Sequence, residues 1–251
     1  MLLEGRNAVI YGGAGAIGSA VAKAFAREGA TVHLAGRTLA RLDAVAEQIR
    51  GDGGRAETAV VDALDEEAVD RHADAVVAEA GSLDISFDLI SLGDVHGTPL
   101  ARMALEDFER PVRNAVRTTF LTARAAARHM IRQRSGVILT FGGTGDPMRD
   151  YAIGGFQVAL GAVDVLRRQL AAELGPHGIR VVTLLTGGVT DTIPMDFEGR
   201  DAIVDGIVGS TMLGRAATFD DVGNVAAFAA SDHARTITAS AINISCGSIV
   251  G

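Results

Sequence analysis

The chain has 251 residues, 48% of them hydrophobic, which suits one α/β domain with a core on both faces of a sheet. Its net charge of −8 argues against nucleic acid or an anionic membrane as a partner. The lone cysteine, Cys246, excludes an intrachain disulfide, and the six scattered histidines lack metal-ligand spacing, so we predict no metal site.

The first residues, "MLLEGRNAVIYGG", carry an acidic side chain early and no basic segment before their short apolar run. This pattern argues against a signal peptide. No apolar run reaches the ~18 residues that a membrane-spanning helix needs. We therefore expect a soluble cytoplasmic protein that does not enter a membrane.

Short apolar runs alternate with longer helical patterns along the chain. Such alternation predicts a parallel sheet with helices on both faces, and right-handed crossovers then give a doubly wound fold. We expect a single α/β domain over residues 1–251, of the Rossmann type, with a seven-stranded, mostly parallel sheet. The only long irregular stretch is expected at 190–215, where it could form a mobile lid. Strands are expected at 7–12, 31–36, 55–63, 83–91, 136–143, 179–185 and 240–245, and helices at 16–30, 41–54, 65–81, 105–131 and 154–175.

The glycine-rich turn "VIYGGAGAIGSAVA" joins the first expected strand to the first expected helix. Glycines at such a turn let the backbone bend tightly and approach a pyrophosphate, and the helix N-terminus supplies N–H donors. An ordinary glycine-rich connection is the alternative, but the place of the turn in the first strand–turn–helix unit favours a dinucleotide. The turn residues expected to bind the cofactor are Gly12, Ala14, Gly15, Ala16, Ile17 and Gly18.

The end of the second strand, "LAGRT", indicates which dinucleotide binds. NAD sites of this type carry an acidic residue there for the ribose 2′-hydroxyl, whereas this chain has Gly36 followed by Arg37. An arginine can pair with a 2′-phosphate through two hydrogen bonds. Arg37 therefore favours NADP over NAD, with a solvated loop arginine as the alternative.

Three segments together resemble the short-chain dehydrogenase/reductase family: the glycine turn, "VVDA" at the end of the third strand, and the C-terminal "GRAATFDDVGNVAAFAASDHARTITASAINISCG". The turn resembles the family's Thr-Gly-x-x-x-Gly-x-Gly, with Tyr11 in place of Thr and Ala16 in place of the middle Gly. The resemblance covers nearly the whole chain. It implies a nicotinamide cofactor, a small-molecule substrate, and assembly as a homodimer or homotetramer.

The resemblance also implies cofactor contacts outside the glycine turn. Asp62 would form a hydrogen bond near the adenine, and Ala63 would line the adenine pocket. Ser91 stands where the family has a glycine beside the nicotinamide ribose. The backbone of Val189 would contact the carboxamide.

The family uses an Asn, a Ser, a Tyr and a Lys for catalysis, and Asn114 matches the first of these. The segment "RRQLAAELGPHGIRV" sets the register, because in the family its Glu, here Glu173, follows the Lys at a set distance. Counting back puts Leu160 at the Lys position and Phe156 at the Tyr position. Independently, the strand "GVILTFGG" puts Gly143 at the Ser position.

Tyr151 lies five residues before the family tyrosine position, and the fourth residue after it is Gly155 rather than a lysine. Tyr151 remains a candidate catalytic residue because a phenol can donate a proton. The alternative is that it is a solvated loop residue. The same two interpretations apply to the other loop candidates for a substitute acid, which are Asp94, His96, Thr144, Asp146 and Asp150.

Two functions follow from these observations. The first is an NADP(H)-binding oxidoreductase that acts on a carbonyl or alcohol substrate, with Gly143, Phe156 and Leu160 in place of the usual Ser, Tyr and Lys. The second is a catalytically inactive relative that serves as a dinucleotide-binding or regulatory module. The matching glycine turn and Asn114 favour the first, and the loss of three catalytic side chains favours the second.

Overall fold

The computed structural model describes residues 1–143 and 151–250 of the chain. Within them, seven strands form one sheet in the order β3-β2-β1-β4-β5-β6-β7, and all six strand pairs are parallel. This order confirms the predicted doubly wound α/β fold. The strands are β1 (Asn7–Tyr11), β2 (Thr31–Gly36), β3 (Arg55–Val60), β4 (Ile85–Asp88), β5 (Gly136–Gly142), β6 (Ile179–Leu185) and β7 (Ser240–Asn243).

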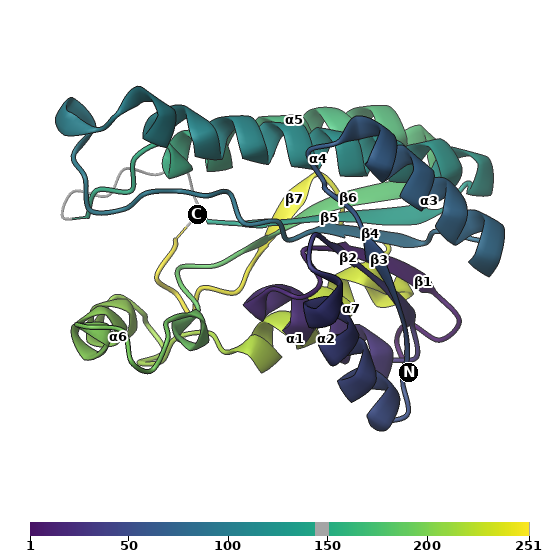
Figure 1. The fold of residues 1–251 in the computed structure, drawn as a ribbon, viewed down its shortest axis with the longest axis horizontal. Helices are drawn as coiled ribbons and strands as arrows, with labels where there is room; N and C mark the ends of the chain where they lie inside the picture. The colour runs from purple at the N-terminus through teal and green to yellow at the C-terminus, as the bar shows by residue number, and fades with distance from the viewer. Residues whose placement is uncertain (144–150, 251) are drawn as a thin grey trace.

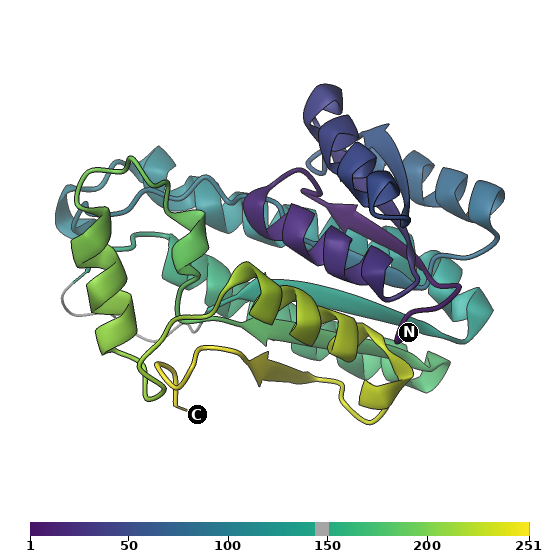
Figure 2. The same cartoon turned by 90° about the horizontal axis from the view of Figure 1, so that it is seen from below.

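The α-helices of the described residues are α1 (Ala16–Arg27), α2 (Leu39–Gly51), α3 (Glu66–Ala80), α4 (Leu105–Gln133), α5 (Phe156–Leu174), α6 (Arg200–Gly209) and α7 (Phe219–Ala230). Helices α3, α4 and α5 lie on one face of the sheet, and α1, α2 and α7 lie on the other (Figure 1). Helix α6 stands apart from both layers, beyond the carboxyl ends of the strands (Figure 2). None of these helices is both long enough and apolar enough to cross a membrane.

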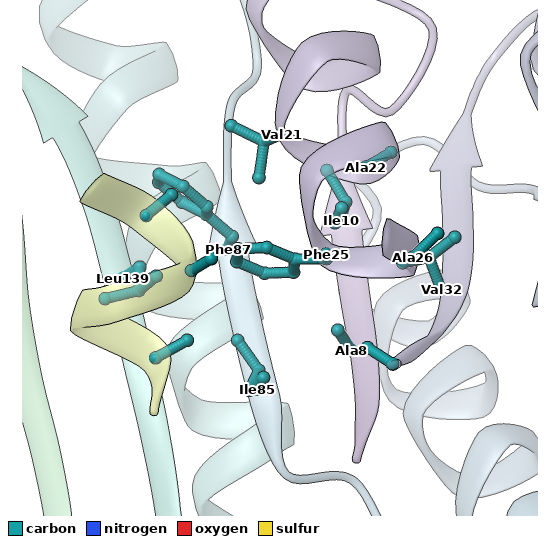
Figure 3. Close-up of a cluster of buried hydrophobic side chains, with 14 of the residues drawn as sticks. Ala8, Ile10, Val21, Ala22, Phe25, Ala26, Val32, Ile85, Phe87 and Leu139 are labelled. Atoms are coloured by element: carbon teal, nitrogen blue, oxygen red, sulfur yellow. The ribbon is translucent and has the colours of Figure 1, made fainter. Parts of the chain in front are cut away.

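Two apolar cores hold the layers together, one on each face of the sheet. Phe25 of α1, Phe87 of β4 and Ile10 of β1 belong to the core under α1 and α7 (Figure 3). Tyr11 of β1 and Met130 of α4 belong to the core on the other face. Neighbouring residues of β1 enter opposite cores because successive strand side chains point to opposite faces. Each of these five side chains is at most 1% exposed, and such burial stabilises by roughly 1.5–3 kcal/mol per side chain.

Strands β3 and β4 each end three residues before the apolar pattern predicts, and an aspartate side chain turns the backbone at or just after each end. The Asp88 side chain accepts a hydrogen bond from the backbone N–H of Ile90 at 3.1 Å, directly after β4. The Asp62 side chain accepts one from the N–H of Leu64 at 3.0 Å, just after β3. An aspartate that bonds to the backbone two residues on forms a turn that competes with the ladder. Both segments therefore leave the sheet at its carboxyl edge.

The stretch 190–215 is partly helical, so the expectation of a wholly irregular segment is wrong. It contains the short turn Thr190–Thr192 and the helix α6. None of the residues of α6 is buried, and Gly206 and Gly209 lie within it. A helix that buries no continuous apolar face leaves a weak periodic signal in the sequence, which is why it was missed.

Candidate functional site

The glycine turn between β1 and α1 is held close to two neighbouring strands. The N–H groups of Gly12 and Gly13 both donate to the carbonyl oxygen of Ala35 in β2, at 2.8 and 3.2 Å. Gly12 has a φ of +80°, and a Cβ there would lie 2.5 Å from the carbonyl oxygen of Leu89. Only glycine therefore suits this position, where the backbone turns next to the end of β4.

The second part of the turn sets the start of α1. Gly15 donates its N–H to the carbonyl oxygen of Gly12 at 2.8 Å and is the residue before the helix. A Cβ on Gly18 would overlap that same carbonyl oxygen. Within the described residues, the first turn of α1 has no acidic residue, and no side chain caps it. The positive end of α1 is thus open to an anion, and Ala14, Ala16 and Ile17 border it without being buried.

Two arginines stand beside this turn. Arg37 directly follows β2 and is exposed. Arg41, one turn further on in α2, donates from Nη2 to the carbonyl oxygen of Ala14 at 3.2 Å. Sequence reasoning singled out Arg37 and missed Arg41, although its spacing of four residues from Arg37 places both near the same end of α2.

The remaining predicted cofactor residues lie in segments that follow the strands. Asp62 is exposed after β3, while its neighbour Ala63 is 3% exposed. Ser91 is exposed in the segment after β4. Val189, after β6, is buried and forms a parallel bridge with Ala217. All of these segments leave the carboxyl edge of the sheet, which is where ligands bind in doubly wound folds.

Asn114 links helix α4 to this edge. Its side-chain Nδ2 donates to the carbonyl oxygen of Leu92 at 3.0 Å, and the residue is half-buried. The bond ties the middle of α4 to the segment that leaves β4. Asn114 therefore has a visible positioning contact, whatever further role it has in chemistry.

Gly143 and Leu160, which the resemblance aligns with the family Ser and Lys, lie close together. Leu160 of α5 is 8% exposed, and a Cβ added to Gly143 would lie 3.4 Å from its Cδ1. A Cβ added to Gly142 would lie 2.9 Å from its Cδ2. The leucine thus packs on the two glycines that end and follow β5. The contact between Leu160 and these glycines is therefore apolar.

Gly155, the fourth residue after Tyr151, lies in tight contact with α4. A Cβ at position 155 would overlap the carbonyl oxygen of Phe108 in α4. A side chain of any length therefore has no room there while α4 and α5 keep their packing. A lysine four residues after Tyr151 would not fit in this packing, which agrees with the register that the resemblance implies.

Tyr151 instead belongs to a polar cluster with two residues from the loop after β4. The hydroxyl of Tyr151 lies 3.5 Å from Nδ1 of His96, and Nε2 of His96 lies 2.7 Å from Oδ2 of Asp94. The hydrogen bond from His96 holds the pKa of the Asp94 carboxyl below its usual value. The other loop candidates, Thr144, Asp146 and Asp150, lie outside the described residues.

Phe156, the first residue of α5, adjoins this cluster. The ring centres of Phe156 and His96 are 5.6 Å apart, and those of Tyr151 and His96 are also 5.6 Å apart with the planes nearly perpendicular. The backbone N–H of Gly97 donates to the carbonyl oxygen of Ala152 at 2.6 Å, which joins the two loops. The His96 imidazole therefore contacts both the Tyr151 ring and the Phe156 ring.

Beneath the glycine turn lies a second polar group that sequence reasoning missed. Burial raises the pKa of the Asp88 carboxyl, partly offset by hydrogen bonds that include those from Ile90 N–H and the Thr119 hydroxyl. Burial also raises the pKa of Tyr11, whose ring meets His72 edge to face at 5.8 Å. These groups are covered by the core and have a structural role.

Comparisons with known proteins agree with this geometry. A family model described as enoyl-(acyl carrier protein) reductase matches residues 12–248. D-threitol dehydrogenase of Mycolicibacterium smegmatis is 30% identical over 98% of this chain and 93% of its own. Gluconate 5-dehydrogenase of Gluconobacter oxydans is 28% identical over 91% and 89%. A solved short-chain dehydrogenase from Burkholderia cenocepacia in complex with NADP has a TM-score of 0.86 and 28% identity, and the match covers 99% of both chains.

Proposed function

The chain belongs to the short-chain dehydrogenase/reductase family of oxidoreductases, and from this premise we propose that it binds NADP(H) and interconverts a carbonyl compound and an alcohol. NADPH supplies a hydride when it is bound. The protein must therefore hold the nicotinamide and the substrate together and provide a proton to the substrate oxygen.

The observation that carries the proposal is the cradle at the start of α1. A Cβ would collide with backbone at both Gly12 and Gly18, and the open helix N-terminus can accept the pyrophosphate. Arg37 and Arg41 lie beside this cradle, and the planar guanidinium group of an arginine can bind a 2′-phosphate through two hydrogen bonds. These features fit NADP(H) better than NAD(H), since the end of β2 has no carboxylate for a free 2′-hydroxyl.

Four further residues complete the proposed cofactor site. Asp62 and Ala63 would contact the adenine, and Ser91 would contact the nicotinamide ribose. The backbone of Val189 would bind the carboxamide. Their common place at the carboxyl edge of the sheet supports these assignments.

One specific observation favours a second candidate, a dinucleotide-binding protein without turnover. Gly143, Phe156 and Leu160 are apolar where the family carries Ser, Tyr and Lys, and Leu160 packs firmly on the glycines of β5. Such a protein would bind NADP(H) through the same cradle. The two candidates therefore differ in turnover and share the cofactor.

A two-step experiment separates them. NADPH and NADH are titrated into the purified protein, with nicotinamide fluorescence as the readout, and tighter binding of NADPH is expected. NADPH oxidation is then followed by absorbance with a panel of carbonyl compounds. The panel includes small polyhydroxy ketones because two relatives are named for D-threitol and gluconate. Binding without oxidation of NADPH by any compound would favour the second candidate.

We also propose that the protein assembles as a homodimer or homotetramer. Helices α4 and α5 pack against each other and still expose apolar side chains to solvent. These are Val116 and Phe120 on α4, and Val158 and Val165 on α5. Contiguous exposed apolar residues are typical of protein–protein contacts. Light scattering on the purified protein tests this, and a monomer at all concentrations would contradict it.

A further inference from the structure

We propose that Tyr151, His96 and Asp94 form a proton relay that takes the place of the missing family residues, with Tyr151 as the catalytic acid. The inference rests on the proposed function as an NADP(H)-dependent oxidoreductase. It assigns the proton donor that Gly143, Phe156 and Leu160 cannot supply.

The first support is the order of the three polar groups. The distance of 2.7 Å between Asp94 Oδ2 and His96 Nε2 is that of a strong hydrogen bond to a carboxylate. Because Nε2 then carries the proton, Nδ1 is the nitrogen that faces the Tyr151 hydroxyl at 3.5 Å. That second contact is at the outer limit of a hydrogen bond, and acid–base contacts often tighten only when substrate binds. The carboxylate thus orients the imidazole, and the imidazole faces the phenol.

The second support is the place of the relay. The His96 ring packs on Phe156, which stands at the family tyrosine position, so the relay borders the region where the family proton donor acts. Its three side chains are partly exposed, with Tyr151 at 45%, and so can meet a substrate. The bond between Gly97 and Ala152 holds the two loops together across 55 residues of sequence.

Within the described part of the chain, few charged groups lie around the relay. On α4, Arg110 donates from Nε to the carbonyl oxygen of Gly93 at 2.9 Å and pairs with Asp107 at 2.6 Å. The start of α5 contributes only the apolar Phe156. Among the described residues, Asp94 is therefore the charged group in direct contact with His96.

The proton balance is simple. During carbonyl reduction the hydride from NADPH forms the new C–H bond, and the substrate oxygen takes the hydroxyl proton of Tyr151. The tyrosine oxygen then regains a proton from water, relayed through Nδ1 of His96, while Nε2–H stays bonded to Asp94. Water reaches Nδ1 because the imidazole is partly exposed. The net reaction consumes one carbonyl compound, one NADPH and one proton.

Turnover of variants tests the relay. Tyr151→Phe should lower kcat by roughly 100-fold or more, the usual range for general acid catalysis, while KM and NADPH affinity stay unchanged. His96→Gly should lower kcat in the same way, and added imidazole should restore part of it. A substitution at His177, a partly exposed histidine before β6 at the opposite edge of the sheet, is the matched control and should change nothing.

A second measurement does not depend on turnover. The ¹⁵N chemical shifts of histidine ring nitrogens distinguish protonated from bare nitrogen. In the protein without cofactor, neutral His96 should carry its proton on Nε2, and Asp94→Asn should abolish that preference. The His96→Gly variant identifies the signal.

The outcomes separate the two proposals. If the wild-type protein turns over a carbonyl compound and Tyr151→Phe is equally active, the relay is wrong and the proposed function stands. If Asp94→Asn leaves the His96 tautomer unchanged, the pairing of Asp94 with His96 is wrong. If the wild-type protein binds NADPH but no carbonyl compound supports NADPH oxidation, both the relay and the proposed oxidoreductase activity are wrong.

Discussion

Arg41 of α2 donates a hydrogen bond from Nη2 to the carbonyl oxygen of Ala14, and so ties a second helix to the glycine turn. The bond orients a guanidinium toward the loop that we propose to cradle the pyrophosphate. Arg41→Ala should therefore weaken NADPH binding by roughly fivefold, the size of one net hydrogen bond. Fluorescence titration measures this, with Arg71→Ala on α3 as a control that should bind normally. Equal affinity of Arg41→Ala and wild type would show that the bond is incidental.

Arg37 should decide which cofactor binds. Arg37→Ala removes a cation that we expect to contact only the 2′-phosphate, so NADPH affinity should fall by about tenfold or more while NADH affinity stays the same. Titration of both cofactors into the same variant gives the comparison. An equal loss for NADPH and NADH would mean that Arg37 supports the turn rather than the 2′-phosphate.

Much of the fold could be predicted because the apolar runs and the glycine turn are local signals. The ends of β3 and β4 could not, because the turns that Asp62 and Asp88 form there depend on side-chain bonds that the apolar pattern does not show. Helix α6 was missed for a related reason, since it buries none of its residues. Where burial is weak, the sequence pattern is weak as well.

Only part of the candidate site could be predicted from the sequence, for a different reason. Arg37 and the glycine turn are neighbours of a strand end, so their place follows from the strand order. The cluster of Asp94, His96 and Tyr151 joins loops 55 residues apart, and only the packing of those loops brings the side chains together. The exclusion of a lysine at Gly155 also depends on a backbone contact, with Phe108 of α4, that no local pattern shows.

Gly18→Ala should disrupt the cofactor cradle. The new Cβ would overlap the carbonyl oxygen of Gly12, and relief requires a shift of backbone in the turn. We expect the free energy of unfolding to fall by roughly 1–3 kcal/mol and NADPH binding to be lost. Gly51→Ala, at the end of α2 with no atom near its Cβ, is the control and should keep both properties. Normal NADPH binding by Gly18→Ala would remove the steric argument for the cradle.

Gly155, just before α5, and Gly161, within α5, provide a test substitution and its control. Gly155→Ala places a Cβ against the carbonyl group of Phe108 and should destabilise the protein by roughly 1–3 kcal/mol. Gly161→Ala meets open space within the helix and should stabilise it by about 0.5–1 kcal/mol. Urea unfolding of both variants measures the difference. A stable Gly155→Ala variant would mean that α4 and α5 can separate, and the steric exclusion of a lysine at 155 would fail.

His72 should make the protein less stable in mild acid. Burial, together with the nearby His33, lowers the pKa of His72 from 6.5 to about 4. Above pH 6.5 the His72 imidazole is neutral in both the folded and the unfolded state, so it does not lower the free energy of unfolding there. As the pH falls from 6.5 to about 4, His72 binds a proton in the unfolded chain but stays neutral in the folded protein. The free energy of unfolding therefore falls by roughly 3 kcal/mol. Below pH 4 both states are protonated, and His72 causes no further loss.

The variant His72→Phe isolates this effect. It keeps an aromatic ring against Tyr11 and removes the titrating group, and the Nδ1 atom of His72 has no partner among the described residues. Urea unfolding of wild type and variant at pH 7 and pH 4.5 should show a smaller loss in the variant, by roughly 2–3 kcal/mol. His33 remains in both proteins, and burial lowers its pKa too, so its share of the acid sensitivity cancels in the comparison. An equal loss in both proteins would show that His72 is protonated as easily in the folded state as in the unfolded chain.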